Sequence, residues 1–237
     1  MDKENWIWIL AATTLLTLHL FFTALNFREF LSISTLRPAS FLLSAHIHFT
    51  GQIVRHLPGR LWGLLYQIGM ARDVFPAAVI TRANMDMVVF ALFGNLIVAT
   101  AILGLGRIIP PFLALFLCIT GIALLISSVL GGSSGILCAM GNLIPPKYAR
   151  IKTFAAALAE SRLTLGTLLH VTLIFSASWL VYGAAWISIG LAFPVMAETN
   201  PLILCAWYTF AWFIGYVSIV TPGGLGIREV TFVLMAG

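Results

Sequence analysis

Two positions in this chain bring an arginine and a carboxylate close together within a largely apolar sequence. Arg82 precedes Asp86 by four residues, the spacing at which side chains meet on one face of a helix. Arg228 is followed directly by Glu229, and because adjacent side chains on a helix diverge, we expect these two to have separate partners. Ionisable groups in an apolar environment are costly unless they pair or function. These four side chains are therefore the first candidates for chemistry.

Each of these positions follows an element rich in proline and glycine along the chain. The residues of interest are Pro58, Gly59 and Arg60 in the first element and Pro222, Gly223, Gly224 and Gly226 in the second. Proline ends a helix, and glycine allows sharp turns that expose backbone N–H groups to an anion. Because a planar guanidinium suits phosphate oxygens, we interpret Arg60, Arg82 and Arg228 as candidate phosphate ligands. The alternative is that these arginines only anchor the chain at the lipid headgroups.

The composition indicates a membrane protein. The chain has 237 residues, 60% of them apolar and only 9% charged, with a mean hydropathy of +1.02, whereas a soluble domain carries about 25% charged residues. Long apolar runs without strand-like alternation favour helices. We therefore expect an all-α fold, a polytopic transmembrane helical bundle, with no soluble catalytic domain. The net charge of +5 at pH 7 is spread along the chain, which does not suggest nucleic-acid binding.

The hydropathy pattern predicts about six membrane spans in a single domain over residues 1–237. The spans are expected at residues 6–27, 39–54, 87–105, 112–130, 165–190 and 202–220. The stretch 163–193 is long for one helix, and the sequence leaves open whether it holds one helix or two. We expect Asp73 to cap the long helix that contains the third span.

Lysine and arginine in the connections predict the orientation of these spans. With six crossings, ten basic residues fall on the side of the N-terminus and three on the other side, so the N-terminus is expected in the cytoplasm. The two proline–glycine elements, four spans apart, then lie at the same face. We expect them to be re-entrant elements beside a shared cavity, since irregular backbone at membrane depth must be buried in protein or line a cavity. The alternative is two turns at the membrane surface.

The histidines and cysteines do not suggest a metal or redox site. His46 and His48 are two residues apart and so point to opposite sides of a helix, which is unsuitable for chelating one ion. The three cysteines have no paired spacing, and we expect them to be small buried apolar side chains. Neither a metal nor a cofactor is expected. The single histidines of the apolar spans, His19 and His170, are expected to form hydrogen bonds between helices.

The residues around the two elements also resemble a known family. The stretch His56–Trp62, which reads HLPGRLW, is followed by Gly69 and then by a helix with Arg82 and Asp86. This order is similar to the first signature of the lysylphosphatidylglycerol synthase transmembrane family of flippase-like proteins. The stretch Pro222–Glu229 resembles the second signature of that family. The resemblance implies a multi-pass inner-membrane protein. Members carry an amino-acid-modified phospholipid across the bilayer, or accompany polysaccharide or glycolipid synthesis.

The resemblance covers residues 5–237, with two departures from the family pattern. Members usually continue through further helices after the second signature, whereas this chain stops at Gly237, which leaves two alternatives, a fragment truncated at the C-terminus or a degenerate copy. Members often have an acidic residue directly before the helix arginine, where this chain has Thr81, which leaves Asp86 as the carboxylate partner of Arg82. The fused aminoacyl-transfer domain of the lysyl-lipid synthases is not found in this chain, so that reaction is not expected.

Together these observations predict a flippase or transporter of a lipid or lipid-linked saccharide in the inner (plasma) membrane. Its expected partners are membrane lipids and a glycosyltransferase or lipid-synthesis enzyme, with no nucleic acid. The candidate substrate-binding residues are Arg60, Arg82, Asp86, Arg228 and Glu229. The alternative function is that of a non-catalytic membrane subunit that supports envelope polysaccharide or glycolipid synthesis. A third hypothesis is an intramembrane transferase that uses Glu229 or Asp86 as its base.

Overall fold

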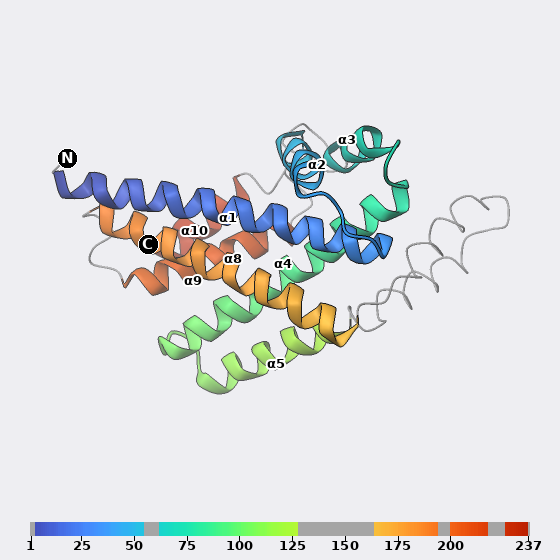
Figure 1. Cartoon of the computed structure of the whole chain (residues 1–237). Helices are drawn as coiled ribbons and strands as arrows, with labels where there is room; N and C mark the ends of the chain where they lie inside the picture. The colour runs from blue at the N-terminus through green and yellow to red at the C-terminus, as the bar shows by residue number, and fades with distance from the viewer. Residues whose placement is uncertain (1–2, 55–61, 128–163, 194–199, 218–225, 237) are drawn as a thin grey trace. The chain divides into compact units, whose positions relative to one another are not determined.

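The expected all-α helical bundle is confirmed by a computed structural model (Figure 1). The structure describes residues 3–54, 62–127, 164–193, 200–217 and 226–236, and every regular element in these residues is an α-helix. The helices are α1 (Lys3–Thr35), α2 (Phe41–Val54), α3 (Trp62–Ala71), α4 (Ala77–Leu105), α5 (Pro111–Ser127), α8 (Leu165–Ala192), α9 (Pro201–Val217) and α10 (Ile227–Ala236). The stretch whose helix count the sequence left open holds the single helix α8 from Leu165 onward.

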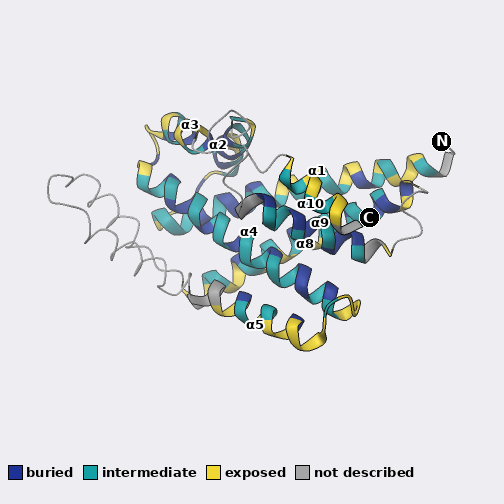
Figure 2. Cartoon of the chain, turned by 180° about the vertical axis from the view of Figure 1, so that it is seen from behind, coloured by how far each residue is buried: buried dark blue, intermediate teal, exposed yellow. Residues whose placement is uncertain are grey.

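Three of the described helices are long and apolar enough to cross a membrane. Their qualifying stretches are Asn5–Thr35 in α1, Ala77–Leu105 in α4 and Gly166–Ala192 in α8. Helices α5 and α9 contain shorter apolar stretches. Large apolar side chains are exposed on α5, among them Phe112 and Phe116, and Figure 2 colours parts of this helix as exposed. Such surfaces are unfavourable in water and suit contact with lipid, so the chain has the helices of a membrane protein.

The first helix extends beyond both ends of the span expected at residues 6–27. The expected span ends at residue 27, but α1 continues to Thr35, because the charges of Arg28 and Glu29 pair with each other and do not end the helix. It ends where Leu36 adopts a left-handed conformation with φ 54°. The N–H of Arg37 then donates to the carbonyl of Ser32 at 3.2 Å, the bond that closes a Schellman motif.

The start of α4 also differs from the expectation that Asp73 caps it. The N–H groups of Val74 and Phe75 donate to the carbonyl of Ala71, so this stretch is a turn that follows α3. The first helical bonds of α4 are accepted by the Pro76 carbonyl. Asp73 instead lies beside Arg72, 3.7 Å from its Nε atom, with both side chains exposed. The prediction of an Asp73 cap was wrong by about one turn.

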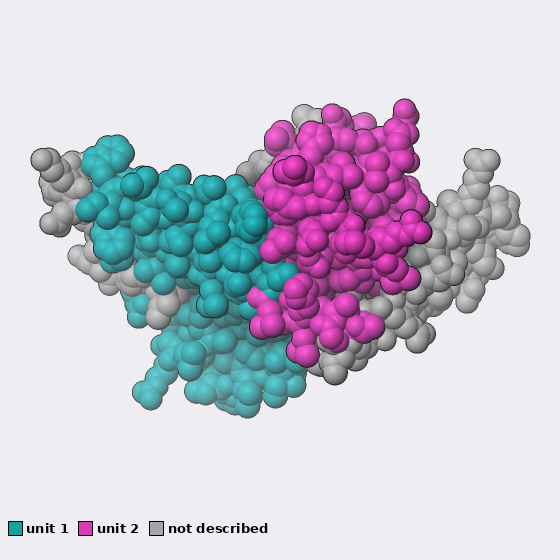
Figure 3. Space-filling model, in the orientation of Figure 1, with its two compact units in different colours: residues 1–23, 91–122, 174–237 teal, residues 24–90, 123–173 magenta. Residues whose placement is uncertain are grey.

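The chain divides into two compact units, coloured separately in Figure 3. Unit 1 comprises residues 1–23, 91–122 and 174–237, and unit 2 comprises residues 24–90 and 123–173. Their interiors differ in chemistry. Unit 2 buries the polar side chains Asn26, Ser44, His48, Gln67, Arg82 and Asp86. Unit 1 buries uncharged polar side chains and also contains a cluster of aromatic rings from α8, α9 and α10. Among the described residues, the buried charged side chains Arg82 and Asp86 both lie in unit 2.

Candidate functional site

The Arg82–Asp86 pair lies buried in α4 and forms as the sequence predicts. The Arg82 Nε–H donates to both carboxylate oxygens of Asp86, at 3.0 and 2.9 Å. The two side chains are only 5% and 12% exposed. Arg82 is five residues after the start of α4, which places it about 7.5 Å along the helix axis. A buried ion pair therefore lies within a helix that is long enough to cross a membrane.

A second buried polar pair was missed by the sequence analysis. The Asn84 Nδ2 donates to the Gln67 Oε1 at 2.8 Å and to the Ile80 carbonyl at 2.8 Å, and this joins α4 to α3. Gln67 is only 2% exposed. Asn84 is two residues from both Arg82 and Asp86, about 200° around the helix. Helix α4 therefore carries polar groups on two opposite sides, the ion pair on one and the amide pair on the other.

Gly51 of α2 makes room for this amide pair. A Cβ atom at position 51 would lie 2.2 Å from the Gln67 Nε2 and 2.5 Å from its Cδ. Real Cβ atoms essentially never approach another atom so closely, so only glycine permits the observed packing. The signal in the sequence is a glycine inside an apolar helix, which often marks a close approach of two segments. Gly51, Gln67 and Asn84 thus connect α2, α3 and α4.

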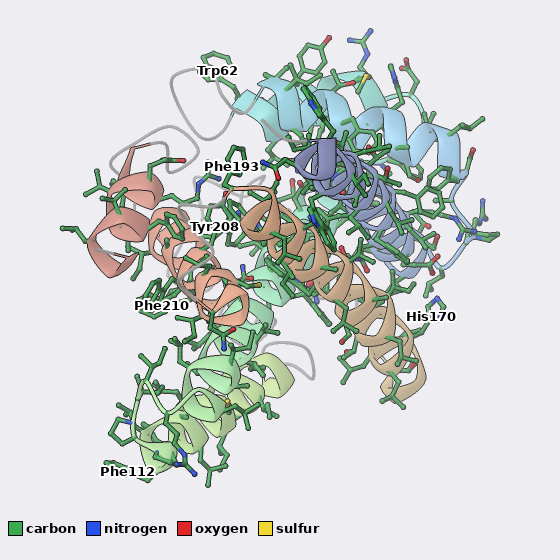
Figure 4. The ribbon with its side chains drawn as sticks, turned by 90° about the vertical axis from the view of Figure 1, so that its left-hand side faces the viewer. Trp62, Phe112, His170, Phe193, Tyr208 and Phe210 are labelled. Carbon is green, nitrogen blue, oxygen red and sulfur yellow. The ribbon has the colours of Figure 1, made fainter. Side chains whose placement is uncertain are left out.

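A third polar cluster joins α1 to α8 within unit 2. The Glu29 Oε1 accepts a hydrogen bond from the Arg28 Nη1 at 2.7 Å, and the Glu29 Oε2 lies 3.6 Å from the Nε2 of His170. The Arg28 Nε also donates to the Ala39 carbonyl at 2.9 Å. His170, labelled on α8 in Figure 4, is 60% exposed, and Glu29 is 16% exposed. The sequence predicted an interhelix partner for His170 but did not identify Glu29 as that partner.

Arg228 and Glu229 pair with one another, so the prediction of separate partners was wrong. The Arg228 Nε and Nη2 donate to the Glu229 Oε1 at 2.9 and 2.5 Å. The Glu229 Oε2 accepts the Gly226 N–H at 2.7 Å. Glu229 is the third residue of α10, where its side chain turns back to the N-cap as in a capping box. The rule that neighbours diverge holds in a helix interior, but here the cap brings the carboxylate back across the guanidinium.

The hydrogen bonds of Glu229 with Arg228 and Gly226 determine whether its carboxyl is ionised. Partial burial works against ionisation of the Glu229 carboxyl. Hydrogen bonds from Arg228 and from the backbone N–H groups of Glu229 and Gly226 outweigh that effect, and the pKa of Glu229 is lowered from its ordinary value. Gly226 has φ +84°, a conformation that glycine adopts without strain. Both charges of the pair are therefore present at neutral pH.

An aromatic cluster packs against α10. The Arg228 guanidinium lies 5.7 Å from the ring centroid of Tyr208, within cation–π range. The Tyr208 ring, labelled in Figure 4, stacks on Trp186 of α8 at 3.8 Å and meets Phe232 of α10 edge-on at 5.8 Å. Rings from three helices thereby hold α10 against α9. The sequence shows these residues as ordinary apolar positions.

The remaining site predictions concern the proline–glycine elements themselves. Arg60, Pro58, Gly59, Pro222, Gly223 and Gly224 lie outside the described residues. The helices that flank each element are described, and in both cases they pack against one another, α2 against α3 and α9 against α10. The shared cavity stays a prediction. His19 forms the expected interhelix contact, with its Nδ1 at 3.1 Å from the Ser178 carbonyl of α8.

Metal chemistry and relationships to other proteins complete the description of the site. Among the described residues, no group of three or more His, Cys, Asp or Glu side chains is placed to hold a metal ion. Comparisons of the chain with family models, curated proteins and solved structures found no match. The resemblance to the lysylphosphatidylglycerol synthase transmembrane family therefore stays a prediction from the residues of the two signatures.

Proposed function

We propose that this membrane protein moves a lipid with an anionic headgroup between leaflets, either a phospholipid, unmodified or amino-acid-modified, or a lipid-linked saccharide. The observation that carries the proposal is the buried Arg82–Asp86 ion pair inside a helix of membrane-spanning length. Ionisable groups at membrane depth commonly mark the path of a polar substrate. In this proposal Arg82 binds the headgroup phosphate, and Asp86 holds the guanidinium between substrates.

The chemistry of exchange supports these roles. A phosphate oxygen and a carboxylate oxygen are equivalent acceptors for a guanidinium N–H. A headgroup phosphate can therefore replace Asp86 on the Arg82 Nε, where both carboxylate oxygens now accept. The arginine keeps an anionic partner throughout, so the buried guanidinium charge stays compensated during the exchange. Arg228 is the second proposed phosphate ligand, because its partner Glu229 is half-exposed and open to replacement.

A translocation assay tests the proposal. Purified protein in liposomes that contain fluorescent phosphatidylglycerol should speed the movement of label between leaflets, measured by quenching of the outer leaflet. Polyprenyl-phosphate sugar is the second substrate to test. Arg82→Gln should reduce the rate at least tenfold. Arg72→Gln is the matched control, because Arg72 is an exposed arginine in the turn before α4, and its rate should be unchanged.

A charge swap separates substrate binding from structural pairing. The double variant Arg82→Asp with Asp86→Arg keeps an ion pair at the same spacing but moves the cation by one helical turn. If the pair is only structural, the swapped protein should be stable and should transport at the wild-type rate. If Arg82 binds phosphate, the swapped protein should be stable but slow. Normal transport in this variant would remove the role proposed for Arg82.

The non-transporting subunit is the second candidate function, and one observation favours it. The Arg82–Asp86 pair joins two residues of one helix, which also suits a purely structural role. This function is supported if the protein moves none of the tested lipids in liposomes but co-purifies from native membranes with a glycosyltransferase or lipid-synthesis enzyme. The same outcome would refute the transport proposal.

A further inference from the structure

We infer that α2 and α3 form a re-entrant hairpin that enters and leaves the membrane on the same side, and that the Gln67–Asn84 amide pair locks this hairpin onto α4. The sequence instead predicts a full crossing at residues 39–54, so the inference changes the path of the chain. It concerns the path of the chain through the membrane and does not depend on transport.

The lengths of the two helices carry the first step. Helix α2 has 14 residues and α3 has 10, which correspond to about 21 Å and about 15 Å at 1.5 Å per residue. The hydrocarbon core is about 30 Å thick. As described, each helix is shorter than this core, and neither is among the stretches that are long and apolar enough to count as candidate spans. Two such helices in series could cross only if they were stacked end to end.

The packing of the two helices excludes an end-to-end arrangement. Helices α2 and α3 pack against one another, and Gly51, near the end of α2, touches the Gln67 side chain in the middle of α3. The two helices therefore lie side by side and not in line. Since α1 and α4 are both of spanning length, the hairpin connects the end of one crossing to the start of the next without making a crossing of its own.

The distribution of polarity on α3 favours lipid rather than water around this helix. On α3 the exposed side chains include Trp62, Leu65 and Tyr66, and the buried face carries Gln67 between Gly63 and Ala71. This is the reverse of a helix on a soluble protein, which buries its apolar face and exposes its polar one. An apolar outer face that includes Trp and Tyr suits the boundary between hydrocarbon and headgroups.

The amide pair explains how the hairpin stays in place. A buried amide surrounded by apolar groups is unfavourable unless it is hydrogen-bonded, and Gln67 Oε1 finds its partner in Asn84 of α4 at 2.8 Å. Gly51 lets α2 close over the same side chain. These three residues position the hairpin beside the α4 turns that hold Arg82 and Asp86. They are positioning residues for the site and are not proposed to touch substrate.

Cysteine labelling tests the path of the chain. In a background without the native cysteines, Leu36→Cys, Val74→Cys and Leu105→Cys place single thiols at exposed positions near the ends of α1, α3 and α4. None of these changes alters a charge, so the signals for orientation are retained. A membrane-impermeant maleimide is applied to right-side-out and inside-out vesicles. Positions 36 and 74 should react from the same face and position 105 from the opposite face.

Either of two results would overturn the hairpin. Labelling of positions 36 and 74 from opposite faces would show that the segment crosses, and labelling of 74 and 105 from one face would show that α4 does not. The lock is tested with Ala71→Cys, a position only 1% exposed. This thiol should be protected in the otherwise unchanged protein and should react at least fivefold faster when Gln67→Leu is added. Unchanged protection would refute the lock. Because labelling does not require transport, a failure of the proposed function leaves this test intact.

Discussion

Gly51→Ala is the sharpest single test of the packing described for unit 2. The added Cβ would lie 2.2, 2.5 and 2.6 Å from Nε2, Cδ and Cγ of Gln67, so the whole side chain must move away from Asn84. Loss of this buried hydrogen bond costs about 1–3 kcal/mol, and overpacking adds about 1–3 kcal/mol. The higher helix propensity of alanine offsets about 1 kcal/mol of this destabilisation. We expect a net destabilisation of about 1–5 kcal/mol.

The assay is thermal unfolding in detergent, with Gly69→Ala as the matched control. Gly69 also lies in a short helix, α3, but a Cβ there would meet nothing within 4 Å, so this change should raise Tm slightly through helix propensity. Gly51→Ala should lower Tm by several degrees. In a Gln67→Ala background the same glycine change should become nearly neutral, because the clashing atoms are gone. Equal shifts for the two glycine variants, or no coupling to Gln67, would refute the reasoning.

Three further predictions follow from the contacts described. Asp86→Ala leaves the Arg82 charge buried without its carboxylate and should destabilise the protein by about 3–5 kcal/mol, whereas Arg82→Met with Asp86→Leu together should cost much less; chemical denaturation compares the two. Gly104→Ala should lower Tm, because its Cβ would lie 2.4 Å from an alanine Cβ on α5; a normal Tm would contradict this. The pKa of Glu229 is lowered in the folded protein, so its contribution to the stability of the α10 cap is present above the ordinary glutamate pKa and is lost as the pH falls through the lowered value. Amide exchange at the start of α10 should therefore become faster on acidification. Glu229→Gln should remove this pH dependence.

The sequence predicted the helices well where hydrophobicity alone determines them. The long apolar run of α4 is unambiguous because its length matches the bilayer, whereas the run of α8 left one helix or two open. Arg82 and Asp86 were also predictable, since the four-residue spacing places them together on any regular helix. The sequence could not show where α1 ends, because that depends on a side-chain pair, Arg28 with Glu29, and on the left-handed Leu36 that follows.

Contacts between distant segments were the part that could not be predicted. The Gln67–Asn84 bond joins residues from different helices, and a single glutamine in a short apolar segment gives no sign of its partner. Glu29 and His170 lie on α1 and α8 and are likewise unrelated in sequence. The prediction that Arg228 and Glu229 have separate partners was wrong for another reason. Helix periodicity describes interior residues, and the capping interaction at Gly226 overrides it.

The α2–α3 hairpin also removes one of the membrane crossings that the sequence predicts before α4. Because the hairpin does not cross the membrane, α4 starts on the side where α1 ends. The segments that follow, up to any further non-crossing element, then lie on the opposite side from the one that a six-crossing topology gives them. From the end of α1 to the first turns of α4 the sequence has Arg28, Arg37, Arg55, Arg60, Arg72 and Arg82, whereas Lys3 and Arg107 flank the opposite ends of the two helices. With six against two, the excess of positive charge now lies on the hairpin side. One pair of short helices is thus sufficient to move the favoured position of the N-terminus from the cytoplasm to the opposite face.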